Sequence, residues 1–153
     1  MELTYDQLFY NLTLPPIDTP EFNDIVQWEI DKCLGGVSID GVDISGWLYW
    51  HLCHWWIRDD YEDEYGNIQR KPLRASLRDN EWEAGEYLEQ CRVEKKGYLQ
   101  VGVRQWGKRE IMASYLGYHA ELFEHTQNVI VGGNDDDLQL LRDKIDFGIR
   151  HIW

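Results

Sequence analysis

The chain has 153 residues, enough for one domain, and its 43% apolar and 14% aromatic content excludes a disordered chain. Its formal net charge of −13 repels phosphate backbones on average, which argues against broad nucleic-acid binding. A local basic cluster stays compatible with phosphate binding.

The first helix is predicted after an irregular start. Residues 1–20 contain three prolines, and we expect them to form an extended arm. Thr19-Pro20-Glu21 has the pattern of a helix N-cap followed by the first helical positions. Apolar residues then recur at helical spacing until Gly35-Gly36, which supplies the stop. This pattern predicts a helix from about residue 20 to residue 34.

A hairpin and a second helix are predicted next. Alternating apolar residues over 37–44 flank Asp40-Gly41, a strong signal for a two-residue turn. Ser45 can cap a helix from Gly46 to about Ile57. That helix is apolar almost all round, which predicts that it is buried.

The middle of the chain is polar and acidic. Residues 58–74, centred on Gly66-Asn67, indicate a hairpin or an excursion loop. A third helix is predicted from Asp79 or Asn80 to Val93, with Asn80 and Glu83 in a capping-box-like pattern. We expect its acidic side chains to form a solvated face, namely Glu81, Glu83, Glu86 and Glu89.

The last third of the chain is predicted to alternate between strands and helices. It reads as a strand over 98–101, a helix over about 108–123, a strand over 128–131 and a helix from Asp135. Strand–helix–strand–helix order builds parallel sheets. We therefore predict an α/β fold in which residues 1–94 form a mostly helical region with a β-hairpin and residues 95–153 form the first βαβα part of a parallel sheet core.

One segment at the predicted strand–helix junction carries recognisable chemistry. It fits Gly-x-x-x-x-Gly-Lys-[Ser/Thr] at every position except the last. Its residues are Gly102, Val103, Arg104, Gln105, Trp106, Gly107, Lys108 and Arg109. In such a loop, glycines allow backbone N–H groups to converge on phosphates, and the helix N-terminus adds partial positive charge. The plain alternative is a turn whose glycines serve packing only.

The last position of the motif departs from the pattern. Ser or Thr there would place a hydroxyl on Mg²⁺, whereas the guanidinium of Arg109 cannot ligate a cation. We therefore expect phosphate affinity with weakened or lost metal-dependent hydrolysis, and whether the chain is an enzyme stays open.

The segment Arg104-Gln105-Trp106-Gly107-Lys108 resembles the variant phosphate loop of tailed-phage terminase large subunits, in which an Arg stands early in the loop. The likeness extends over most of the chain, upstream through 41–56, 63–67 and 77–82 and downstream through 127–134. It implies a partial P-loop NTPase of the RecA-like class, within the ATPase domain of a viral DNA-packaging motor.

The resemblance also implies a set of site residues and partners. Lys108 would contact the phosphates of ATP, and Arg104 would sense the γ-phosphate or couple hydrolysis to movement, so these two are the catalytic candidates. Trp47, Tyr49 and Gln105 are loose candidates for an adenine pocket. Mg²⁺ is expected from the family, although Arg109 argues against it. Double-stranded DNA, the portal and the small terminase subunit would be partners of the full-length protein, in the host cytoplasm and without a membrane.

Parts of such a motor are missing from the sequence. No apolar run ending in acidic residues follows the loop, and the family's nuclease domain is absent, which predicts a fragment, a truncated product or a repurposed remnant. The alternative is a small acidic phage protein that acts by binding without catalysis, as a DNA mimic or a dominant-negative partner.

Other features favour structural interpretations. Three cysteines at wide spacing predict no disulfide framework and suit a reducing compartment, and neither a signal peptide nor a membrane span is expected. His51, Cys53 and His54 are expected to be core or surface residues rather than metal ligands, and no metal site is predicted. The acidic run 59–64 suggests a solvated face, and Asp135-Asp136-Asp137 suggests a helix start.

Overall fold

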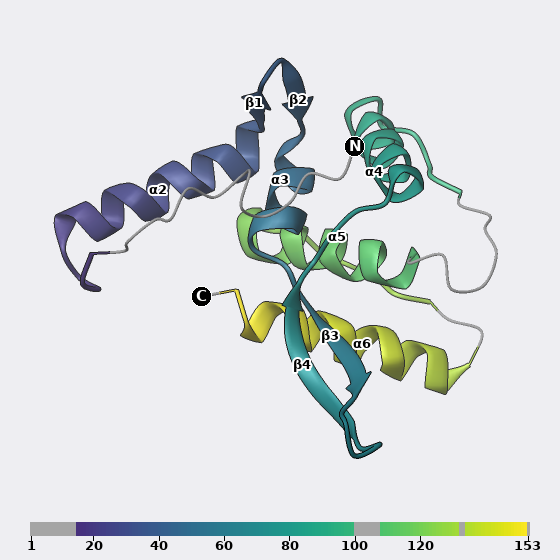
Figure 1. Cartoon of the computed structure of the whole chain (residues 1–153). Helices are drawn as coiled ribbons and strands as arrows, with labels where there is room; N and C mark the ends of the chain where they lie inside the picture. Colours follow the sequence, from purple (N-terminus) through teal and green to yellow (C-terminus); the bar gives the residue numbers. More distant parts are fainter. Residues whose placement is uncertain (1–14, 100–107, 132–133, 153) are drawn as a thin grey trace. The chain divides into compact units, whose positions relative to one another are not determined.

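The computed structural model describes residues 15–99, 108–131 and 134–152 (Figure 1). These residues divide into two compact units. Of the described residues, unit 1 contains 15–53 and 76–99, and unit 2 contains 54–75, 108–131 and 134–152.

Unit 1 begins with helix α2 (Pro20–Gly35), and its two ends have the predicted chemistry. The Thr19 hydroxyl accepts a hydrogen bond from the Phe22 backbone N–H at 3.2 Å, which satisfies a donor that the first turn leaves without a partner. At the other end Gly36 has a φ of 78°. A Cβ at Gly36 would lie 2.4 Å from the Ile44 carbonyl oxygen, so this position needs glycine for space as well as for conformation.

A short antiparallel hairpin follows, formed by β1 (Val37–Ile39) and β2 (Val42–Ile44). Both turn residues are in the left-handed region, Asp40 with a φ of 51° and Gly41 with a φ of 81°. Two consecutive positive φ values are typical of the type I′ turn that matches the twist of a hairpin. The prediction from Asp40-Gly41 is confirmed.

Helix α3 (Gly46–Cys53) is the core of unit 1. All eight of its residues are buried, as its apolar surface predicts, and both α2 and α4 contact it. The predicted end at Ile57 is wrong, because α3 stops at Cys53 and Trp56 is already the first residue of a strand. An apolar run fits a buried helix and a buried strand equally well, so the sequence does not mark this boundary.

Helix α4 (Asp79–Val93) completes unit 1 and packs on α3 through Gly85, whose added Cβ would lie 2.4 Å from the Trp47 ring. The expectation of a solvated acidic face is wrong for two of its residues, since Glu81 and Glu89 are only 8% and 9% exposed. Glu81 accepts a hydrogen bond from the Arg78 backbone N–H at 2.8 Å, and Glu89 pairs with Arg92 at 3.0 Å. Each buried carboxylate is therefore compensated.

Unit 2 consists of a hairpin and two helices (Figure 1). Strands β3 (Trp56–Glu62) and β4 (Ile68–Arg74) pair antiparallel, so of the two predicted alternatives for 58–74 the hairpin is confirmed. Helices α5 (Lys108–Leu122) and α6 (Asp135–Arg150) pack against each other, and α6 also contacts β3.

The fold is mixed α/β, and both described sheets are two-stranded and antiparallel. Residues 98–99 and 128–131, which were predicted to lie in parallel strands, are outside strands in the structure, and the rest of the first segment lies outside the described residues. The apolar pattern at 128–131 predicted a buried strand, and this prediction is wrong, since Val129 and Val131 are 83% and 89% exposed.

Two further sequence expectations bear on the environment of the chain. All three cysteines, Cys33, Cys53 and Cys91, are buried free thiols of unit 1. None of the helices that the structure describes combines the length and apolarity needed to cross a lipid bilayer.

Candidate functional site

The predicted phosphate loop borders the start of α5. Lys108 is the first described residue of that helix, and the motif requires a helix at this position. The loop itself lies outside the described residues, namely Gly102, Val103, Arg104, Gln105, Trp106 and Gly107.

Arg109, the residue that departs from the motif, is tied to the neighbouring helix. Its guanidinium forms an ion pair with the carboxylate of Asp137 in the first turn of α6, and both side chains are about half exposed. The first turns of α5 and α6 are thus linked by opposite charges. Position 109 contributes a cation where the motif expects a metal-binding hydroxyl.

Glu110, the next residue of α5, contacts both α6 and Trp55, the residue before β3. Its side chain is 17% exposed and forms an ion pair with Lys144 of α6. Its other carboxylate oxygen accepts a hydrogen bond from the indole Nε1 of Trp55 at 3.2 Å. A carboxylate with one cationic and one neutral donor tolerates partial burial, and it fixes the rotation of α5 relative to α6 and Trp55.

The Trp55 indole is wedged between glycines of the two helices. It is 0% exposed. A Cβ added at Gly117 of α5 would lie 2.6 Å from the ring, and one added at Gly148 of α6 would lie 2.2 Å from it. Only glycine gives the ring room at both places, so the indole sets the packing of α5 and α6.

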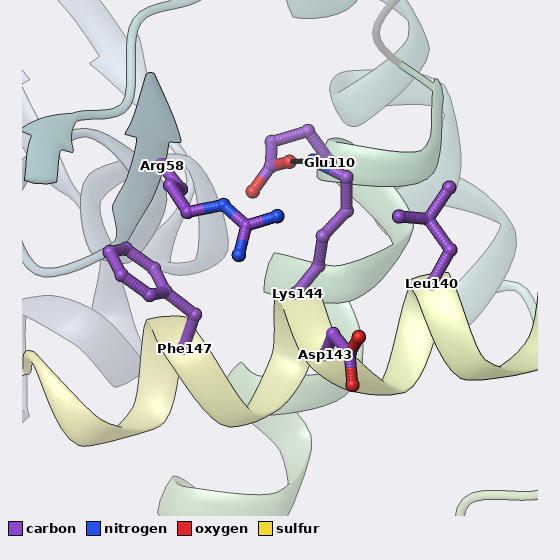
Figure 2. Close-up of a pocket in the computed structure, with 6 residues that line it drawn as sticks. All are labelled: Arg58, Glu110, Leu140, Asp143, Lys144 and Phe147. Carbon is purple, nitrogen blue, oxygen red and sulfur yellow. Dashed lines mark hydrogen bonds and ion pairs between the residues drawn. The ribbon is translucent and has the colours of Figure 1, made fainter. Parts of the chain in front are cut away.

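A cleft lies beside this wedge, between α6, β3 and the first turn of α5 (Figure 2). Its volume is about 160 Å³. The cleft is lined by Arg58, Glu110, Leu140, Asp143, Lys144 and Phe147, all of unit 2.

The charges around the cleft are arranged unevenly. Figure 2 shows the Arg58 guanidinium pointing toward Glu110 and Lys144, whereas the Asp143 carboxylate points away. Asp143 instead accepts a hydrogen bond from the Gln139 side chain at 2.6 Å. Glu110 pairs with Lys144, and the two cations and two carboxylates of the lining sum to zero, so the positive charge of Arg58 faces the hollow while the negative charge of Asp143 faces away.

Unit 1 has its own polar cluster, in the interior. Glu29, 4% exposed, accepts a hydrogen bond from the Tyr49 hydroxyl at 2.7 Å and pairs with Lys32 at 2.6 Å. The Lys32 ammonium also lies 3.2 Å from the centre of the Trp28 ring, in cation–π geometry. Burial raises the pKa of the Tyr49 hydroxyl far above its usual range, and the hydrogen bond to Glu29 acts in the same direction. The cluster therefore stabilises the contact between α2 and α3 and keeps Tyr49 protonated.

The adenine-pocket candidates of unit 1 do not face an open site there. Trp47 is 0% and Tyr49 1% exposed, and both belong to α3, all of whose residues are buried. The third candidate, Gln105, lies outside the described residues.

The histidines near the end of α3 are core residues, as expected. His51 is 1% and His54 4% exposed, and Cys53 is fully buried. Burial lowers the pKa of His51 to about 3, against the opposing effect of a hydrogen bond to the Ser76 backbone. Among the described residues, no group of three or more His, Cys, Asp or Glu side chains is placed to hold a metal ion.

Two acidic segments have structural roles. In the loop between β3 and β4, the Asp63 carboxylate accepts hydrogen bonds at 2.9 Å from the backbone N–H groups of both Tyr65 and Asn67, and these bonds lower its pKa. Asp135-Asp136-Asp137 forms the first turn of α6, with Asn134 as the N-cap accepting from the Asp137 N–H at 2.8 Å. Carboxylates at this end complement the helix dipole, as predicted.

Sequence reasoning did not find the cleft of unit 2. Its ion pair joins residues 110 and 144, which are far apart in the chain and leave no local pattern. A usable signal was present in Gly117 and Gly148, because glycine inside a helix indicates close packing against a large neighbour. Comparison of the chain with protein-family models, curated proteins and solved structures gives no match.

Proposed function

We propose that residues 102–108 bind the anionic tail of ATP at the start of α5, as the ATP-binding part of a viral DNA-packaging motor of the terminase type. The supporting observation is that Lys108 lies in helix α5, directly after a sequence that fits a phosphate loop. Unpaired N–H groups at a helix N-terminus favour phosphate binding, and Lys108 adds a point charge. A parallel P-loop sheet is part of this proposal, and its strands are not among the four described ones.

The ion pair of Arg109 with Asp137 supports a restricted version of this function. A guanidinium that is held beside the first turn of α5 opposes the approach of Mg²⁺ and offers it no ligand. The proposed activity is therefore nucleotide binding with little metal dependence rather than efficient hydrolysis.

Titration calorimetry with ATP, with and without Mg²⁺, tests both parts. The wild type is expected to bind ATP weakly and equally under both conditions, while Arg109→Ser is expected to gain affinity when Mg²⁺ is added. Lys108→Ala is expected to lose binding, and Arg142→Gln, which removes an exposed cation of α6, is the matched control. Loss of the exposed Arg109–Asp137 pair costs at most about 1 kcal/mol, so Arg109→Ser should stay folded.

Two results contradict the proposal. If Lys108→Ala binds ATP as tightly as the wild type, residues 102–108 are not a phosphate-binding loop. If the wild type and Arg109→Ser show the same metal dependence, position 109 does not determine it.

The second candidate is a binding protein that acts through acidic surface, as a DNA mimic or a dominant-negative partner. It is favoured by the net charge of −13 and by exposed carboxylates on α2 and the β1–β2 hairpin. These are Glu21, Asp24, Asp31, Asp40 and Asp43. Adding the purified chain in excess to a packaging reaction driven by a complete motor tests it, and an undiminished packaging rate counts against it.

A further inference from the structure

We propose that the cleft of unit 2 binds a carboxylate attached to a small apolar body, with Arg58 as its anchor. The residues that line the cleft are not among residues 102–108, and the proposal does not depend on nucleotide binding.

The first argument is that the Arg58 guanidinium has donors available for a ligand. Within the part of the chain that the structure describes, its guanidinium makes no hydrogen bond or ion pair, and Figure 2 shows it directed toward Glu110 and Lys144. A guanidinium presents its donors in a rigid fork that matches the two oxygens of a carboxylate. Arg58 is thus a donor available to an incoming anion.

The second argument is the charge of the surroundings. Lys144 already compensates Glu110, and the Asp143 carboxylate points away and accepts from Gln139. The two cations and two carboxylates of the lining sum to zero, but the positive charge that faces the hollow is that of Arg58, and one negative charge of a ligand can pair with it. A monoanionic carboxylate matches the single charge of Arg58, whereas a dianionic phosphate brings one negative charge more than Arg58 pairs with.

The third argument is the shape and lining of the cleft. Phe147 and Leu140 contribute apolar surface beside the charged groups. The volume of about 160 Å³ is comparable to that of a dry cavity of about 150 Å³ that accommodates benzene in another protein. An aromatic or short aliphatic body fits this space, with its carboxylate on Arg58.

Benzoate is a suitable probe, followed by NMR on the Arg58 Nε–H and the Phe147 ring. We expect saturable shifts at both groups in the whole chain. Arg58→Gln should weaken binding by about tenfold or more, because it removes a charge-assisted pair of hydrogen bonds. Arg58→Lys should weaken it less, because the charge stays while the fork is lost. Arg142→Gln, another exposed Arg but outside the cleft, should leave the affinity unchanged.

Four further ligands define the chemistry that the cleft recognises. Benzyl alcohol, which has the ring without the charge, should bind at least tenfold more weakly than benzoate, and inorganic phosphate should also be weaker. N-acetylphenylalanine and its amide distinguish two possible origins of the bound carboxylate, the C-terminus of a peptide and a free carboxylic acid. If the free acid binds more tightly than benzoate and the amide does not bind, the carboxylate belongs to the end of a peptide chain; if benzoate is tighter, it belongs to a free acid.

The proposal is overturned if benzoate gives no saturable shift, if Arg58→Gln and Arg142→Gln bind it equally, or if phosphate or benzyl alcohol binds as tightly as benzoate. The spectra of Arg58→Gln report its folding directly, and Arg58→Lys gives an independent measure if that variant is unfolded. None of these outcomes depends on whether Lys108→Ala loses ATP.

Discussion

Substitution of Gly148 by alanine tests the wedge that holds α5 and α6 together. The new methyl group would lie 2.2 Å from two atoms of the Trp55 ring, far inside normal contact distance. The ring is fully buried and is bounded on its other side by Gly117, so it has little room to move. Overpacking of this kind costs about 1–3 kcal/mol, while replacing a helical glycine gains about 1 kcal/mol. Because the overlap involves two ring atoms at 2.2 Å, we expect a cost in the upper part of this range, about 2–3 kcal/mol, and a net destabilisation of about 1–2 kcal/mol.

Hydrogen exchange of the amides in α5 and α6 measures this cost within unit 2 alone. A loss of about 1–2 kcal/mol corresponds to roughly 5–30-fold faster exchange through global opening of the unit. Gly35→Ala is the matched control, since a Cβ there meets nothing within 4 Å, and it should stabilise α2 slightly or leave it unchanged.

A double-mutant cycle with Trp55→Phe isolates the steric cause. The shorter ring relieves the overlap, so Gly148→Ala should cost at least about 1 kcal/mol less in the Trp55→Phe background. If Gly148→Ala exchanges as slowly as wild type, or costs the same in both backgrounds, the indole does not determine the packing of these helices.

Three more outcomes are expected. Tyr49→Phe should destabilise unit 1 by about 1–2 kcal/mol in urea unfolding, because the buried Glu29 carboxylate loses its hydroxyl donor. Thr19→Ala should cost about 1 kcal/mol in the same assay, because the Phe22 N–H loses its capping oxygen, and Thr19→Ser should retain most of the stability. The free energy of unfolding should fall by about 1.4 kcal/mol per pH unit as pH drops from about 6.5 toward 3, because unfolded His51 takes up a proton while the buried ring with a pKa of about 3 does not. His51→Gln should flatten that slope in urea titrations at several pH values.

Local chemistry made the helix ends and tight turns of unit 1 predictable. Thr19 and Pro20 start α2, and Asp40-Gly41 closes the first hairpin, because a few adjacent residues determine each conformation. The burial of α3 was equally readable from its apolar surface.

Features set by tertiary contacts were not predictable from local pattern. The end of α3 at Cys53 and the switch to β3 at Trp56 interrupt one apolar run. Glu81 and Glu89 are charged, yet bonds to the Arg78 backbone and to Arg92 allow both to be buried. The proposed carboxylate cleft depends in the same way on side chains brought together by folding, Arg58 and Lys144 among them.

The distribution of the cysteines has a practical consequence. Every thiol of the chain is buried, and all three belong to unit 1. A thiol-specific reagent such as an alkylating or chromogenic disulfide compound therefore reacts only after an opening that exposes a cysteine of unit 1. The labelling rate in native buffer reports such openings without any engineered reporter.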